Sequence, residues 1–226
     1  MPTPEPQRDE PGGSDQPSKS PTPAVPGPKD KVYLIGFSAT GKSHSGRLAA
    51  QALGARFVDM DRLIARRAGK QISDIFEQDG EEEFRRIERE VLLEAADSAG
   101  RRVISTGGGV PVDPRNREVM ERSGFTIRLS ASPETIHGRI NRTHSTGERV
   151  GSRSTARRSA ARPMLPDSEN EETSIGRIRE LLAKREEAYA AVTDVEINTE
   201  GREPPDVAAE IVDVIQRMAH GSGATA

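Results

Sequence analysis

Cysteine and tryptophan are absent from this sequence of 226 residues. Without cysteine there are no disulfide bonds, no thiolate metal sites and no cysteine nucleophile, which suits a reducing compartment. No apolar run approaches the roughly 18 residues that a membrane-spanning helix needs. The N-terminus also lacks the apolar core of a signal peptide and the arginine-rich, acid-poor composition of a transit peptide. We therefore expect a cytoplasmic protein without a membrane partner.

A strong charge of one sign is missing as well. The chain has 33 basic and 36 acidic residues, with a formal net charge of −3. This balance provides no field that would hold the whole protein on nucleic acid. We expect no nucleic-acid partner, and we take the chain to be a monomer.

Apolar residues are scarce in two parts of the chain. Residues 1–30 are rich in proline and contain only Met1, Ala24 and Val25 as apolar side chains, which predicts a disordered tail. The segment from about 144 to 172 is also poor in apolar residues and rich in arginine. Such a long loop in a compact domain usually has a function. We expect a folded domain over residues 31–219 and a disordered C-terminus over 220–226.

Within the folded domain, short apolar runs alternate with stretches of helical periodicity. This alternation predicts an α/β fold with a parallel sheet flanked by helices, whose ligands bind at the carboxyl ends of the strands. The expected strands are 32–35, 55–59, 103–104, 125–129 and 195–197, and the expected helices are 44–53, 62–68, 81–96, 133–141, 175–189 and 207–218.

A phosphate-binding loop lies between the first predicted strand and helix. Gly36–Ser43 fits the pattern G, four residues, G-K-[ST]. In this P-loop the backbone N–H groups surround the phosphates, Lys42 reaches the β and γ oxygens, and Ser43 ligates Mg²⁺. The guanine-reading sequence N-K-x-D is absent, which favours ATP over GTP. The expected ATP contacts are Gly36, Ser38, Ala39, Thr40, Gly41, Lys42, Ser43 and His44.

Further motifs follow the loop in a characteristic order. They are Asp59-Met60-Asp61, Phe84-Arg85, Gly107-Gly108-Gly109, Arg162-Pro163 and Lys184-Arg185. This series resembles the shikimate kinases over residues 32 to about 218. The resemblance implies a three-layer P-loop NTPase fold, similar to the nucleoside monophosphate kinases, with a mobile lid. It also implies transfer of the γ-phosphoryl group of ATP to the 3-hydroxyl of shikimate, with Mg²⁺, in aromatic amino-acid biosynthesis.

The resemblance assigns different roles to the two aspartates. Asp59 would help to hold Mg²⁺ through water, together with Ser43. Asp61 would bind substrate hydroxyls and orient or deprotonate the attacking one, a role that a well-placed carboxylate can fill. Taken alone, Asp61 could instead be the N-cap of the helix that follows.

Arg85 and Arg185 would bind the substrate carboxylate, since planar guanidinium groups suit a planar carboxylate. Each could instead form an ordinary surface ion pair. The triple glycine of residues 107–109 would bring free backbone N–H groups close to the substrate. A merely tight turn is the alternative.

The resemblance identifies the arginine-rich segment of about 144–172 as the lid, with Arg142 to Arg162 as the part that matches the family. It places Arg142 near adenine and Arg162 on the transferring phosphoryl group, where a cation delivered on closure would assist catalysis. Because the lid exceeds the usual length by roughly a dozen residues, a range in which loop length costs little stability, Arg157 or Arg158 could take the place of Arg162. A solvated basic loop is the alternative.

Two positions of the phosphate loop depart from the family. Ala39 stands where the family often has glycine, and a loop that needs no positive φ there would tolerate the methyl group. His44 replaces the usual threonine or serine, and we expect it on the helix surface without a catalytic role.

Two other functions remain compatible with these motifs. One is a small-molecule kinase of the same fold that acts on gluconate or a nucleoside monophosphate. The other is a non-enzymatic module that binds ATP or nucleic acid through the arginine-rich loop. The triple glycine and the motif order favour the shikimate kinase interpretation over the other kinases, and a measurement of RNA or DNA binding would test the non-enzymatic module.

Overall fold

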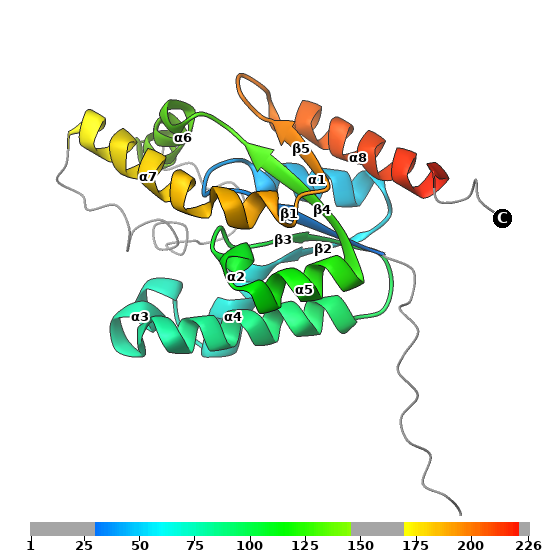
Figure 1. Ribbon diagram of the computed structural model, residues 1–226, viewed down its shortest axis with the longest axis horizontal. Helices are drawn as coiled ribbons and strands as arrows, with labels where there is room; N and C mark the ends of the chain where they lie inside the picture. Colours follow the sequence, from blue (N-terminus) through cyan, green and yellow to red (C-terminus); the bar gives the residue numbers. More distant parts are fainter. Residues whose placement is uncertain (1–29, 146–169, 222–226) are drawn as a thin grey trace, which may run out of the picture.

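The computed structural model describes residues 30–145 and 170–221 (Figure 1). Five parallel strands form one sheet in the order β2-β3-β1-β4-β5. The predicted α/β fold with a parallel sheet is therefore confirmed. The strands are β1 (Lys31–Ile35), β2 (Arg56–Asp59), β3 (Arg102–Ser105), β4 (Gly124–Ser130) and β5 (Val195–Asn198).

Most helices lie where the sequence predicts them. The exceptions are α3, η1 and α5, which are too short to show a clear helical periodicity. The helical elements are α1 (Lys42–Ala52), α2 (Met60–Ala68), α3 (Ile72–Gln78), α4 (Gly80–Asp97), η1 (Val110–Val112), α5 (Pro114–Ser123), α6 (Pro133–Ser145), α7 (Glu171–Ala190) and α8 (Pro204–Gly221).

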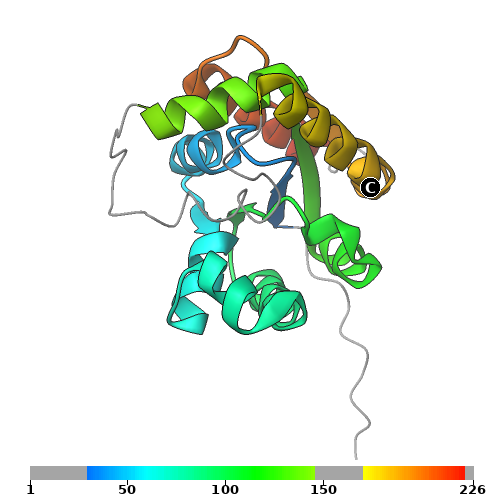
Figure 2. The ribbon, with the colours of Figure 1, turned by 90° about the vertical axis from the view of Figure 1, so that its left-hand side faces the viewer.

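Helices cover both faces of the sheet (Figure 2). In β1, Tyr33 and Ile35 pack into one core with residues of α2 to α5, whereas Val32 and Leu34 face a second core with α1 and α8. This alternation is the period of two expected for a strand whose two faces are both buried. The three-layer arrangement predicted from the family resemblance is confirmed.

The sequence motifs come together at the carboxyl-terminal end of the sheet. The phosphate loop follows β1, Asp59 ends β2, and the triple glycine follows β3. Because neighbouring strands are parallel, these carboxyl ends lie at one level, and Asp59 and Leu34 each pair in register with Ser105 of β3. Residues far apart in the chain thus meet at the carboxyl ends of the strands, where ligands are predicted to bind.

Among the helices in the described part of the chain, none has the length and apolar character needed to span a membrane.

Ala39 has a backbone conformation that alanine seldom adopts. Its φ is 63°, and within the described ranges it is the only residue other than glycine with a positive φ. The loop therefore does need a positive φ at this position, so the condition under which we expected it to tolerate alanine does not hold. A β-carbon in the left-handed region costs roughly 1–2 kcal/mol.

Replacement Ala39→Gly is expected to stabilise the protein by about 0.5–1 kcal/mol, since relief of this strain exceeds the greater entropy of the unfolded chain. The control is Ala183→Gly at an exposed position of α7, which is expected to cost about 1 kcal/mol through lost helix propensity. Urea denaturation of both variants measures the difference. A loss of stability in Ala39→Gly equal to that of the control would contradict the strain.

Candidate active site

The lysine of the phosphate loop lies within the curve of that loop. Lys42 is 8% exposed, and its Nζ donates hydrogen bonds to the carbonyl oxygens of Gly36 at 2.8 Å and Phe37 at 2.7 Å. It belongs to the first turn of α1, whose N-cap is Gly41. The amine and the helix N-terminus therefore supply positive charge to one place, as phosphate binding requires.

Gly36 begins the loop under a tight steric constraint. Its φ is 134°, and a β-carbon would lie 2.2 Å from the carbonyl oxygen of Leu129 in β4. No larger residue fits there without moving β4. The start of the loop therefore packs directly against β4, which fixes the loop at the carboxyl-terminal end of the sheet.

The remaining loop positions are arranged as a P-loop requires. Thr40 is buried, and its Oγ1 donates a hydrogen bond to the Phe37 carbonyl at 2.9 Å. Ser38 and Ala39 are partly accessible. His44 is exposed on α1, as expected. Their contacts with ATP stay a prediction.

The residues predicted to hold Mg²⁺ lie at the ends of adjacent elements. The Ser43 Oγ is 3.1 Å from the Oγ of Ser105, which pairs in register with Asp59. In the described ranges, no group of three or more His, Asp and Glu side chains could hold a metal ion by itself. This donor set fits Mg²⁺, which is usually held by substrate phosphates, water and only one or two protein groups.

The N-cap interpretation of Asp61 is wrong. The N-cap of α2 is Asp59, whose carboxylate accepts a hydrogen bond from the backbone N–H of Arg62 at 3.3 Å. Asp61 lies in the first turn of the helix. Its carboxylate is therefore not needed for capping.

The triple glycine is surrounded by the predicted substrate-binding side chains. A β-carbon on the first glycine of residues 107–109 would lie 3.2 Å from Asp61 Oδ1. On the second it would lie 3.2 Å from Arg185 Nη1, and on the third 2.7 Å from Arg85 Nη1. The lack of side chains in this turn thus lets three charged groups from α2, α4 and α7 approach one another, which a merely tight turn does not explain.

Arg85 does form ion pairs on α4, but it is not an ordinary surface residue. Its guanidinium pairs with Glu88 at 2.8 Å and with Glu81 at 3.2 Å. Burial works to lower the pKa of Arg85, yet the two glutamates outweigh it and raise this pKa above its ordinary value. The two carboxylates therefore fix the Arg85 side chain beside the triple-glycine turn.

Glu88 is a site residue that the sequence analysis did not identify. It is 2% exposed, and its Oε1 lies 3.3 Å from the β-carbon position of Gly107, beside Asp61. Burial raises its pKa, and Arg85 only partly offsets this. Its position was a usable signal, because residue 88 falls on the apolar stripe of α4 between Phe84 and Val91, where a charged side chain must be buried.

Asp61 and Lys42 influence each other electrostatically. Burial raises the pKa of Asp61 to about 6, with Asp59 adding to the effect and Lys42 opposing it. Burial lowers the pKa of Lys42 to about 8, with Asp61 and Asp59 opposing. A carboxyl with a pKa near 6 is suited to proton transfer near neutral pH.

Arg185 extends from α7 to the phosphate loop. Its Cζ lies 5.3 Å from the ring centroid of Phe37, a cation–π distance. The site for substrate and the site for phosphate are therefore contiguous.

Arg139 of α6 contacts the phosphate loop. It donates hydrogen bonds to the Ala39 carbonyl at 3.4 Å and to Thr199 Oγ1 at 2.9 Å. Arg142, the predicted adenine contact, is exposed one turn later. Both are arginines on one helix, so only the fold distinguishes them.

The predicted catalytic Arg162, its alternatives Arg157 and Arg158, most of the lid and nearly all of the tail lie outside the described residues. Helices α6 and α7 extend into the two ends of the predicted lid range. These assignments stay predictions.

Comparison with known proteins agrees with this geometry. The family model of shikimate kinase matches residues 38–216. A shikimate kinase of Symbiobacterium thermophilum is 40% identical over 187 residues, which cover 82% of this chain and 95% of that protein. One of Geobacter sulfurreducens is 37% identical and covers 85% of this chain and 94% of that protein.

Solved structures extend the comparison to three dimensions. Shikimate kinase from Acinetobacter baumannii in complex with shikimate superposes with a TM-score of 0.68 at 31% identity, covering 83% of this chain and 93% of that one. A gluconokinase from Sinorhizobium meliloti reaches a TM-score of 0.52 at 15% identity, covering 85% and 95%, which shows a shared fold alone. With its P-loop, its triple-glycine turn and these matches over most of its length, the chain belongs to the shikimate kinase family of ATP-dependent kinases.

Proposed function

We propose that this protein transfers the γ-phosphoryl group of ATP to the 3-hydroxyl of shikimate, with Mg²⁺. The observation that carries the proposal is the arrangement around residues 107–109. Two guanidinium groups, Arg85 and Arg185, and the carboxylate of Asp61 surround a turn without side chains. A polyhydroxylated acid of small size presents the groups that such an arrangement would bind.

The substrate would be oriented by charge and hydrogen bonding. Arg85 and Arg185 would hold its carboxylate, and the backbone N–H groups of the glycines would approach its ring. Asp61, with a pKa of about 6, would be largely ionised at neutral pH. It would accept a hydrogen bond from the attacking hydroxyl and take up its proton as the phosphoryl group is transferred.

The phosphate loop would bind the second substrate. When bound, MgATP supplies the phosphoryl group, and the metal neutralises charge on the phosphate oxygens. Lys42 would exchange its two carbonyl partners for the β and γ oxygens, and the Ser43 hydroxyl would ligate the metal, with Asp59 acting through water. We retain Arg162 as the cation that the lid would bring to the transferring group.

The proposal extends to the state of the protein in the cell. Asp61, Arg85, Arg185 and Lys42 come from one chain, so the site needs no second subunit. We propose a cytoplasmic monomer in aromatic amino-acid biosynthesis with no nucleic-acid or membrane partner.

A coupled assay of ADP release decides between the candidate substrates. We expect MgATP-dependent ADP production with shikimate and at least about a hundredfold lower kcat/KM with gluconate or AMP, because a misplaced carboxylate or hydroxyl leaves buried charges unpaired. Absence of shikimate-dependent ADP production would refute the proposed function. Tight binding of RNA that disappears on deletion of residues 144–161, without kinase activity, would favour the non-enzymatic module.

The replacement Arg85→Lys tests the carboxylate contact. The ammonium group cannot form the paired hydrogen bonds of a guanidinium, so we expect the KM for shikimate to rise about tenfold to a hundredfold. The matched control is Arg86→Lys, the next residue of α4, which is exposed and pairs with Glu83 and Glu90. Steady-state kinetics should show less than about a twofold change for the control. Equal effects of the two replacements would exclude Arg85 from substrate binding.

The titration of Asp61 predicts a pH dependence. Its active form is ionised, and its pKa is raised to about 6 in the protein without substrate, so kcat/KM for shikimate should fall about tenfold per pH unit below pH 6 and level off above it. We expect Asp61→Asn to lower kcat by about a hundredfold or more while ATP affinity stays nearly unchanged. Asp213→Asn, which breaks a surface ion pair of α8, is the control. Unchanged turnover in Asp61→Asn would remove this residue from the mechanism.

A further inference from the structure

We infer that Tyr189, near the end of α7, is a positioning residue that holds the triple-glycine turn and Arg185 in place for the substrate carboxylate. The inference rests on the proposed function and adds to it a residue that does not itself touch the substrate. Tyr189 is fully buried, at 0% exposure. Its Oη donates a hydrogen bond of 2.7 Å to the carbonyl oxygen of Gly108.

The hydroxyl of Tyr189 lies where three parts of the site meet. A β-carbon on Gly108 would be 3.2 Å from Arg185 Nη1, 3.3 Å from the Gly36 carbonyl oxygen and 3.6 Å from Tyr189 Oη. Burial raises the pKa of Tyr189 although the nearby Arg185 works against it, so the hydroxyl keeps its proton at neutral pH. A neutral hydroxyl can donate to Gly108 permanently, which fixes the turn relative to α7.

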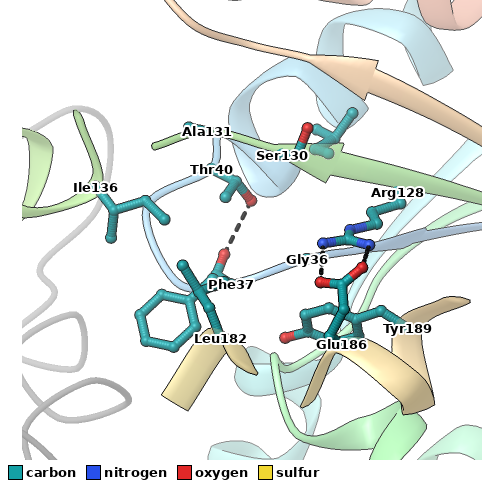
Figure 3. A pocket seen from close by; sticks show the side chains of 11 residues that line it. Gly36, Phe37, Thr40, Arg128, Ser130, Ala131, Ile136, Leu182, Glu186 and Tyr189 are labelled. Carbon is teal, nitrogen blue, oxygen red and sulfur yellow. Dashed lines mark hydrogen bonds and ion pairs between the residues drawn. The ribbon is translucent and has the colours of Figure 1, made fainter. Parts of the chain in front are cut away.

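The ring of Tyr189 is itself held from the sheet. The Cζ of Arg128, in β4, lies 5.2 Å from the ring centroid. The same guanidinium forms two parallel hydrogen bonds of 2.7 Å with the carboxylate of Glu186 on α7 (Figure 3). The Arg128 side chain is 11% exposed and that of Glu186 is 55% exposed, and paired charge-assisted hydrogen bonds of this kind are directional. Arg128 therefore fixes the part of α7 that carries both Tyr189 and Arg185.

A pocket of about 110 Å³ borders Tyr189, between residues of α7 and the start of the phosphate loop (Figure 3). Leu182 of α7 and Ile136 of α6 line it. Around this pocket, α7 packs through Tyr189 in the main core and through Leu182 against Phe37. The hydrogen bond from Tyr189 to Gly108 adds to these contacts a directed link between α7 and the turn.

The replacement Tyr189→Phe removes the hydroxyl and keeps the ring under Arg128. We expect the KM for shikimate to rise about tenfold, because the hydroxyl no longer holds the turn and Arg185 in a fixed relative position. The kcat and the KM for ATP should change less than about twofold, since Lys42 and Asp61 do not depend on this hydrogen bond.

The chain provides a matched control in Tyr33→Phe. The sequence contains two tyrosines, and Tyr33 is also fully buried, with its Oη 2.7 Å from the Oγ of Ser123. That pair lies in the core between β1 and α5, away from the turn. Both replacements should lower the thermal midpoint by similar amounts, whereas only Tyr189→Phe should change the KM for shikimate.

A substrate analogue separates positioning of Arg185 from a general loosening of the site. In the carboxamide of shikimate the carboxylate charge is absent, so Arg185 contributes little to binding. With this analogue we expect the ratio of kcat/KM between wild type and Tyr189→Phe to be smaller than with shikimate, because only the contribution of the turn remains.

The possible results are distinct. A raised KM for shikimate in Tyr189→Phe alone, with a smaller effect on the carboxamide, supports the inference. Equal KM values in the two tyrosine variants, or an effect that is undiminished with the carboxamide, would overturn it while leaving the proposed function intact. Wild-type protein that releases no ADP with shikimate would overturn both.

Discussion

The absence of side chains at residues 107–109 is the constraint on which the site depends. The groups of Asp61, Arg85 and Arg185 each approach within 3.2 Å of a position where a β-carbon would stand. Any larger residue would push at least one of them away. Three helices can therefore converge on the end of β3 only because the glycines there have no side chains.

The second requirement is a balance of buried charge. Lys42, Asp61 and Glu88 lie in surroundings that disfavour ionisation, and each has a pKa shifted toward neutrality by burial. The charge of Arg85 is balanced by the two glutamates that pair with it. Charges of both signs thus coexist in a small volume, and the strained conformation of Ala39 adds a local cost at the same edge.

Much of the fold was predictable because its signals are local. The apolar runs of β1 and β4 and the stripe of α4 report burial directly through their periodicity. The elements α3 and α5 were not predictable, since each buries only a few residues against a face supplied by α4. The phosphate loop was recognised with its strand and helix, but not the positive φ of Ala39, which the backbone path imposes.

For the site, residue types and their order indicated the chemistry, while the tertiary structure decided which groups meet. The P-loop pattern and the motif series by themselves determined a nucleotide-binding kinase of a known family, because each motif is local and the motifs follow one another in a characteristic order. Only the fold could distinguish Arg139 from Arg142, assign the α2 N-cap to Asp59, and bring Glu88 and Tyr189 to the turn. These features depend on contacts between segments that are far apart in the chain. The sequence alone does not give the spatial distances between such segments.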